Sequence, residues 1–355
     1  MPHALCALAL LSLSLLLFAP SALACGALGW DSPPTTATTI APARVSLSEL
    51  EDYLADALLR DGYAYVRVSA EGTDGSMGET AADGAIIFDD PGLLAALSPV
   101  GQPLYGDPWK VMTIDFQKAR ARPQAAQSHD GLEFHHEVAY TGQPPRHLAL
   151  HCRANAGKAR EGGNLLLCDG KGALDGLAPR VIDALRSTPF TNTIDPDHAP
   201  MPLLRPVEIR PGGSHITAWP NAAEAGGAGG AGGAGEAGEE GKAEEGKAEE
   251  GTGEDSAALF QDEATVEERF IFSAIGGSCG PQSTYFAPAP GHEAKGNLVL
   301  SSIIPKLLAC PHARRIEWRA GDLVVVDNHR IMHARLALNV EAKDEDRNIA
   351  HVRLK

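Results

Sequence analysis

The pattern of apolar and polar positions becomes regular after residue 42. Leucines recur every fourth residue from Leu50 to Leu58, and Ser46 with Glu49 forms the capping box that precedes many helices. This predicts a helix of about fifteen residues that ends at the following Asp-Gly pair. The run YAYVRV comes next and alternates large apolar side chains with Ala and Arg, which predicts a strand.

Most of the remaining chain consists of short apolar runs separated by Gly, Pro and Asn. Only one convincing helix interrupts the middle of the chain, the segment LAPRVIDALR at 177–186. We predict strands in the runs near residues 111, 132, 147, 164, 270 and 297, and in 322–328 and 349–354. This pattern favours a mainly β protein with few helices.

Three segments fall outside this pattern. Residues 1–24 carry no charged side chain and end in Ala-Leu-Ala, which is typical of a signal peptide, although a membrane anchor or a wrong gene start would also fit. Residues 25–42 are rich in Thr, Pro and Ala and are predicted to be a flexible linker. Residues 222–255 are a Gly/Ala/Glu tract without aromatic or β-branched side chains apart from one threonine, so we predict a disordered insertion in a single domain spanning 43–355.

The composition excludes several classes of protein. The net charge is -16, half of it from the ten acidic and two basic residues of 222–255, and no basic stripe is present, which argues against a nucleic-acid binder. Six cysteines occur without a C-x-x-C pair, so their spacing predicts neither a zinc ribbon nor a disulfide framework. No apolar segment after the leader is long enough to span a bilayer, and the leader itself suggests entry into the secretory pathway.

The candidate chemistry lies in the segment FHHEVAY. His135 and Glu137 are two residues apart, so both side chains can face one metal from the same side of an extended strand, whereas His136 points to the other side. His333, just past a second apolar run, offers a third ligand. Two histidines and one carboxylate are the facial set that non-haem Fe(II) oxygenases use. Taken alone, an H-x-E motif is more often a chance occurrence.

Three blocks of sequence change this balance. LEFHHEVAYTGQPPRHLALHC, EGGNLLLCDG and WRAGDLVVVDNHRIMHAR occur in that order, and together they resemble the TauD/TfdA family of Fe(II)- and 2-oxoglutarate-dependent dioxygenases, in the clavaminate-synthase-like branch with Glu as the carboxylate. The resemblance covers roughly residues 43–355 apart from the acidic insertion. It implies a double-stranded β-helix, or jelly roll, with helices packed outside.

The resemblance also implies roles for individual residues. His135, Glu137 and His333 would bind Fe(II). Arg347, fourteen residues after His333, matches the family's arginine that binds the far carboxylate of 2-oxoglutarate, and Arg353 in the same strand is the alternative.

Other family positions differ in this chain. The family's G-G-x-T segment, whose threonine contacts 2-oxoglutarate in many relatives, reads Gly162-Gly163-Asn164-Leu165 here, so the hydroxyl is missing and Asn164 is the candidate substitute. His351 stands where many relatives carry a second arginine. Arg335 matches the arginine of the family's H-G-R, for which we expect a supporting role. Asp327-Asn328 fits a turn, or a hydrogen bond that orients the metal histidine.

The expected activity is oxidation of a small-molecule substrate by O2 with 2-oxoglutarate as cosubstrate, giving succinate and CO2 and, by default, hydroxylation of an unactivated C–H bond. Two alternatives stay open. One is a non-catalytic, metal-binding relative of the family. The other is a zinc-dependent hydrolase, because two histidines and one glutamate also form a catalytic zinc site. The sequence favours iron, since the C-terminal arginine has no duty in zinc hydrolysis.

Overall fold

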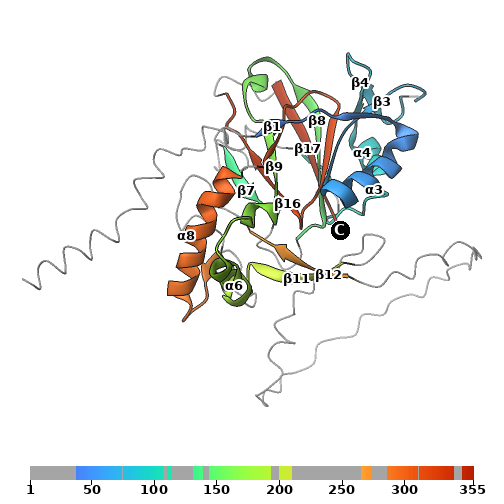
Figure 1. Ribbon diagram of the computed structural model, residues 1–355. Helices are drawn as coiled ribbons and strands as arrows, with labels where there is room; N and C mark the ends of the chain where they lie inside the picture. The colour runs from blue at the N-terminus through green and yellow to red at the C-terminus, as the bar shows by residue number, and fades with distance from the viewer. Residues whose placement is uncertain are drawn as a thin grey trace, which may run out of the picture.

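A computed structural model describes residues 37–73, 75–106, 110–113, 131–138, 144–192, 200–209, 265–272, 286–310, 312–339 and 346–355. Two sheets lie together at the centre, with helices on either side (Figure 1). The predicted leader and acidic insertion, and most of the predicted linker, lie outside the described residues. None of the helices in the described parts of the chain is long and apolar enough to cross a membrane.

The larger sheet has six strands in the order β2-β3-β15-β8-β17-β6. Its neighbouring strands are antiparallel except for the parallel pair β2 and β3. The bounds are β2 Ala43–Ser46, β3 Tyr63–Ser69, β6 Met112–Thr113, β8 His147–Asn155, β15 Asp322–Asp327 and β17 Arg347–Leu354. The strands predicted at 63–68, 322–328 and 349–354 are therefore present.

The second sheet has five strands in the order β1-β14-β9-β16-β7. The bounds are β1 Thr38–Thr39, β7 Leu132–His135, β9 Leu165–Asp169, β14 Arg314–Ile316 and β16 Ile331–Arg335. Three two-stranded pairs complete the β structure: β4 Gly78–Thr80 with β5 Ile86–Phe88, β10 Phe190–Asn192 with β13 Phe286–Pro288, and β11 Leu204–Ile209 with β12 Thr265–Phe270. Strand β1 therefore lies within the segment that was predicted to be a flexible linker.

The core lies in three layers, and alternation along the strands assigns each side chain to a layer. Val324 of β15 and Leu167 of β9 point into the space between the sheets, in one buried cluster, whereas Leu323 and Leu166 point outward into the two other clusters. Two facing sheets with apolar inner and outer faces form the double-stranded β-helix that was predicted.

The outer faces are covered by helices. α3 Leu50–Asp61 and α4 Asp90–Leu97 pack on the larger sheet, and α6 Pro179–Ser187 and α8 Glu293–Ala309 pack beside the smaller one (Figure 1). Short 3₁₀ turns occupy Leu47–Glu49, Gly157–Glu161 and Gly172–Leu174. The predicted capping box is present, since the Glu49 carboxylate accepts from the Ser46 N–H at 2.8 Å.

The strand predicted near residue 297 was wrong, because NLVLSSII is part of α8. Val299, Leu300, Ile303, Ile304 and Leu307 are buried against the smaller sheet, at the three- and four-residue spacing of a helix face. Leu298 is exposed on the opposite side. A short run of apolar residues does not distinguish a buried strand from one helical face.

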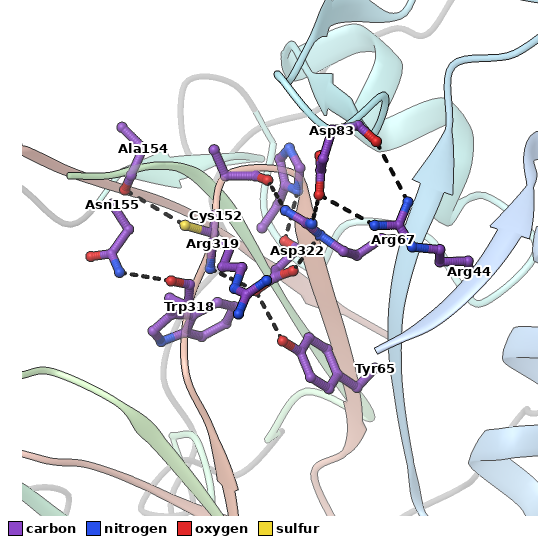
Figure 2. Close-up of polar contacts among 12 residues, drawn as sticks. Arg44, Tyr65, Arg67, Asp83, Cys152, Ala154, Asn155, Trp318, Arg319 and Asp322 are labelled. Atoms are coloured by element: carbon purple, nitrogen blue, oxygen red, sulfur yellow. Dashed lines mark hydrogen bonds and ion pairs between the residues drawn. The ribbon is translucent and has the colours of Figure 1, made fainter. Parts of the chain in front are cut away.

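A buried ionic network holds the first residue of β15 (Figure 2). Asp322 pairs with Arg67 Nε at 2.8 Å and accepts from the Tyr65 hydroxyl at 3.0 Å and from the Arg319 N–H at 2.7 Å. Arg67 also pairs with Asp83. Each charge therefore has a partner in the core, and this end of the strand is held in place.

A disulfide joins Cys168 on the outer face of β9 to Cys310, directly after α8. Sequence spacing does not reveal this bond because the two cysteines are 142 residues apart. Cys152 is buried and has no disulfide partner. The bond fixes the end of α8 to the barrel.

We expect the double variant Cys168→Ala/Cys310→Ala to lose about 2 to 5 kcal/mol of unfolding free energy, because the bond closes a long loop in the unfolded chain. Urea unfolding with and without dithiothreitol measures this loss. The reductant should lower the stability of the wild type to that of the variant and leave the variant unchanged. A wild type insensitive to reductant would show that the bond contributes nothing.

Candidate functional site

The three predicted ligands meet where β7 and β16 pair. His135, the last residue of β7, lies opposite His333 of β16, and their ring centroids are 4.2 Å apart. Glu137 sits in the turn that follows β7. Its Oε2 atom is 3.6 Å from Nε2 of His135 and 3.6 Å from Nε2 of His333. One ligand atom from each side chain thus lies within 4.8 Å of the others.

The turn that carries Glu137 is held by Asn328, at the end of β15. Asn328 Oδ1 accepts from the Glu137 N–H at 2.5 Å, and its Nδ2 donates to the carbonyl oxygens of Glu137 and Pro145 at 3.0 Å each. Val138 follows with φ of 51°, the only positive φ among the described residues other than glycine. This conformation is unfavourable for a β-branched residue, so Asn328 stabilises a strained turn at the site.

Asp327 supports the turn in which Asn328 sits. Its carboxylate accepts from the His329 N–H at 2.9 Å and pairs with Arg146 at 2.9 Å. Burial opposes its ionisation, but the Arg146 guanidinium and nearby cationic groups lower the pKa of Asp327 to about 2. The predicted turn is present, because Asp327 accepts from the His329 N–H. The alternative, a hydrogen bond to a metal histidine, is not what Asn328 makes, since it binds the backbone of Glu137.

We expect Asn328→Ala to weaken divalent-metal binding by about 10- to 100-fold, the range for groups that orient metal ligands. The amide that binds both backbone groups of Glu137 is then lost, and the turn relaxes. Isothermal titration with Co(II) measures the change, and thermal unfolding confirms that the fold persists. Metal affinity equal to that of the wild type would exclude this positioning role.

The local electrostatics favour the donor forms that a metal needs. Burial, followed by the charge of His135, lowers the pKa of His333 to about 4. Burial opposes ionisation of Glu137, yet hydrogen bonds from His135 and His333 together with the charges of His351 and Arg353 hold the pKa of Glu137 well below its usual value. A carboxylate and a neutral imidazole, both able to donate electron pairs, therefore face the same point.

This donor set fits a divalent first-row metal. Cis ligands of an octahedral ion with bonds of about 2.1 Å are about 3 Å apart. Separations of 3.6 Å between Oε2 and each imidazole nitrogen require only slight closure. Imidazole and carboxylate suit iron, and the absence of a thiolate ligand among the described neighbours argues against a structural zinc site.

Arg347 lies on β17, beside the Gly163–Asn164 segment. Its guanidinium donates to the Gly163 carbonyl at 2.6 Å and to Asn155 Oδ1 at 3.4 Å. It is buried, and it pairs with no carboxylate among the described residues. Burial lowers the pKa of Arg347 to about 10, opposed only by the Cys152 thiol. A buried cation with neutral partners is suited to bind an anion.

The Asn164 side chain points elsewhere. With its amide oxygen facing Arg315, Asn164 accepts from Nε at 3.2 Å and from Nη2 at 2.7 Å. The carbonyl of Asn164 accepts from the Leu336 N–H at 2.9 Å. The structure therefore brings the backbone of this segment to Arg347, while the Asn164 amide is engaged by a different arginine.

Of the other residues singled out from the sequence, two lie at Glu137, one lies beyond His333, and one faces away from the site. Arg353 and His351 of β17 both approach Glu137: Arg353 donates to Oε1, and His351 Nε2 is 3.9 Å from the same atom. Arg335 is buried two residues beyond His333, on the same face of β16. His136 is turned away and accepts from the Phe272 N–H at 3.0 Å, as expected for a residue without a metal role.

Comparisons with known proteins agree with this site. The sequence profile of "Taurine catabolism dioxygenase TauD, TfdA family" matches residues 39–353. No curated protein sequence matches the chain. Among solved structures, asparagine oxygenase AsnO has a TM-score of 0.51 at 14% identity, with 86% of this chain and 78% of that chain covered.

Two further structures are similar in fold. OrfP, a non-heme iron oxygenase solved in complex with Fe and alpha-ketoglutaric acid, has a TM-score of 0.50 at 16% identity, covering 87% of this chain and 80% of its own. PvcB, an Fe, alpha-ketoglutarate dependent oxygenase from an isonitrile synthetic pathway, has a TM-score of 0.50 at 14% identity, covering 87% and 82%. At these identities the structures support the fold, and the profile match over most of the chain supports the family predicted from the three sequence blocks. The chain therefore belongs to the TauD/TfdA family.

Proposed function

We propose that the chain is an Fe(II)- and 2-oxoglutarate-dependent dioxygenase that hydroxylates an unactivated C–H bond of a small molecule. The balanced reaction consumes 2-oxoglutarate, O2 and R–H and gives succinate, CO2 and R–OH. The observation that carries the proposal is the convergence of His135 Nε2, His333 Nε2 and Glu137 Oε2 in a chain that matches this family.

His135, Glu137 and His333 would hold the iron, each through one donor atom. Three protein ligands would leave room at such an ion for the cosubstrate and O2. When bound, the iron supplies the redox chemistry by which O2 and 2-oxoglutarate are activated. The chain contributes the ligands in their electron-donating forms, a strained turn that fixes Glu137, and burial that excludes water.

Arg347 would bind the far carboxylate of 2-oxoglutarate. Its burial without an acidic partner among the described residues leaves a cation whose charge a dicarboxylate can neutralise. AsnO is an asparagine oxygenase, and OrfP is a non-heme iron oxygenase that was solved in complex with Fe and alpha-ketoglutaric acid, which supports this assignment. A zinc hydrolase has no use for this buried arginine, and a non-catalytic relative has no need to keep it without a counter-ion.

Release of succinate tests the proposal before the substrate is known. We expect the purified full chain to convert 2-oxoglutarate slowly to succinate when Fe(II), ascorbate and O2 are all present, and each omission to abolish this conversion. Glu137→Ala is the matched control. Succinate formation no greater than in that variant, across a panel of small-molecule substrates, would contradict the proposal and favour the non-catalytic alternative.

We also propose that the chain enters the secretory pathway. The uncharged leader ending in Ala-Leu-Ala supports this compartment, and so does the Cys168–Cys310 disulfide, because such bonds persist where the environment is oxidising. Cleavage after Ala24 would make Cys25 the first residue. N-terminal sequencing of the protein recovered from expressing cells tests this, and an intact Met1 would contradict cleavage.

A further inference from the structure

The two carboxylate oxygens of Glu137 lie in different surroundings. Oε2 is 3.6 Å from Nε2 of both His135 and His333, so it faces the point where a metal would bind. Oε1 accepts a hydrogen bond from Nη2 of Arg353 and lies 3.9 Å from Nε2 of His351. One oxygen is thus directed to the metal position and the other to a guanidinium.

Arg353 is held firmly in this position. Its main chain is paired with Leu148 of β8, and its carbonyl accepts from the Leu104 N–H at 2.7 Å. Its guanidinium carbon lies 5.7 Å from the centroid of the Tyr105 ring, within cation–π range. The side chain is therefore ordered by its own strand and by the 103–105 segment before any ligand binds.

Arg347 and Arg353 lie at opposite ends of β17. Arg353 is six residue steps along the strand from Arg347, about 20 Å of extended chain, and Arg347 donates to Gly163 and Asn155, not to Glu137. A molecule the size of 2-oxoglutarate that binds a metal near Glu137 reaches one of these arginines with its far carboxylate, not both. Arg347 fits that duty because it has no carboxylate partner in the described structure.

We propose that Arg353 is a positioning residue for the metal centre: it binds the outer oxygen of Glu137, so that this carboxylate presents Oε2 alone to the metal. The inference rests on the metal site proposed above. A carboxylate tied by one oxygen to a fixed guanidinium cannot turn to bind the ion with both oxygens. One more coordination position then stays open for the cosubstrate and O2.

The test is a titration of the full chain with Ni(II), which binds imidazole strongly enough to be measured when one ligand is weakened. Arg353→Lys keeps the positive charge but loses the planar fork and some of the reach, so the long-range charge effect on the metal is unchanged. We expect Arg353→Lys to weaken Ni(II) binding at least tenfold. Arg347→Lys is the matched control on the same strand, and its Ni(II) affinity should stay within threefold of the wild type.

A double-mutant cycle shows whether Arg353 acts through Glu137. In the Glu137→Gln background the carboxylate is absent, and we expect Arg353→Lys to change Ni(II) affinity by less than threefold there. A purely structural role would give the same loss in both backgrounds and would overturn the proposal. Near-UV circular dichroism checks the fold. If Arg353→Lys does not fold, Glu137→Asp, which withdraws the carboxylate from Arg353, must lose affinity at least tenfold.

The outcomes separate this inference from the proposed function. If the wild type binds no Ni(II), or binds it as well after His135→Ala, the metal site itself is wrong and the inference is wrong with it. If the wild type binds one Ni(II) and Arg353→Lys binds it equally, the metal site stands and Arg353 has no positioning role. If Arg353→Lys weakens Ni(II) binding in the chain that keeps Glu137 but not in the Glu137→Gln variant, the inference is supported.

Discussion

Substituting any one of His135, Glu137 and His333 by alanine is expected to abolish Fe(II)-dependent turnover. Each side chain supplies one of the three ligands that the described part of the chain offers, and two ligands do not retain a labile Fe(II) ion. We expect succinate release to fall by more than about a hundredfold. This loss is larger than the loss caused by removing a group that only orients a metal ligand. The fold should persist, because the three side chains lie at the end of a strand, in a turn and in a strand whose main-chain pairing is unchanged.

The matched control for these variants is His136→Gln. His136 is the neighbour of His135 and is also buried in the barrel wall, but it faces Phe272 and not the cluster. Metal affinity of this variant should equal that of the wild type. Full activity after alanine substitution of any one of the three would remove that residue from the ligand set.

The second large effect is expected at Arg347. At saturating Fe(II), Arg347→Ala should raise the 2-oxoglutarate concentration for half-maximal turnover by about 30-fold or more, because loss of a buried, charge-assisted pair costs about 2 to 5 kcal/mol. Arg353→Ala should change this concentration far less, because Arg353 is engaged with Glu137.

A shorter 2-oxo acid provides the control for Arg347. With 2-oxobutyrate, which lacks the far carboxylate, Arg347→Ala should resemble the wild type, because the missing contact is then absent from both. If Arg353→Ala impairs 2-oxoglutarate use more than Arg347→Ala does at saturating iron, the two arginines have been assigned in the wrong order.

Much of the site was predictable from local sequence because its main signals are short. The pair His135 and Glu137 lies within one motif, and the apolar run before His333 identifies the strand that leads to the third ligand. The short apolar runs in β15 and β17 predicted their strands for the same reason. The motif with His135 and Glu137 was linked to the distant His333 by the order of three sequence blocks that resemble one family.

The contacts that hold the ligands in place were not predictable in the same way. Asn328 is 191 residues from Glu137, and Arg353 is 216 residues from it. No local pattern indicates which face of a distant strand meets the turn after β7. The bulge in β17 between Asn348 and Ile349 also shifts the register in which its arginines meet the barrel. Asn328 and Arg353 meet Glu137 only because the fold packs the two sheets against each other.

The disulfide and α8 illustrate two other limits. The 142-residue separation of Cys168 and Cys310 leaves no spacing signal. In α8 the apolar run reads as a strand until the exposure of Leu298 and the burial of Ile303 reveal helical periodicity.

The most direct test of the central claim is the visible absorption of the full chain after anaerobic addition of Fe(II) and then 2-oxoglutarate. Chelation of iron by a 2-oxo acid gives a weak charge-transfer band, which neither a zinc hydrolase nor a non-catalytic metal-binding protein should produce. We predict that the band appears in the wild type, is absent in His333→Ala, and in Arg347→Ala requires much more 2-oxoglutarate. A wild type that binds Fe(II) but shows no band at any 2-oxoglutarate concentration would contradict the assignment.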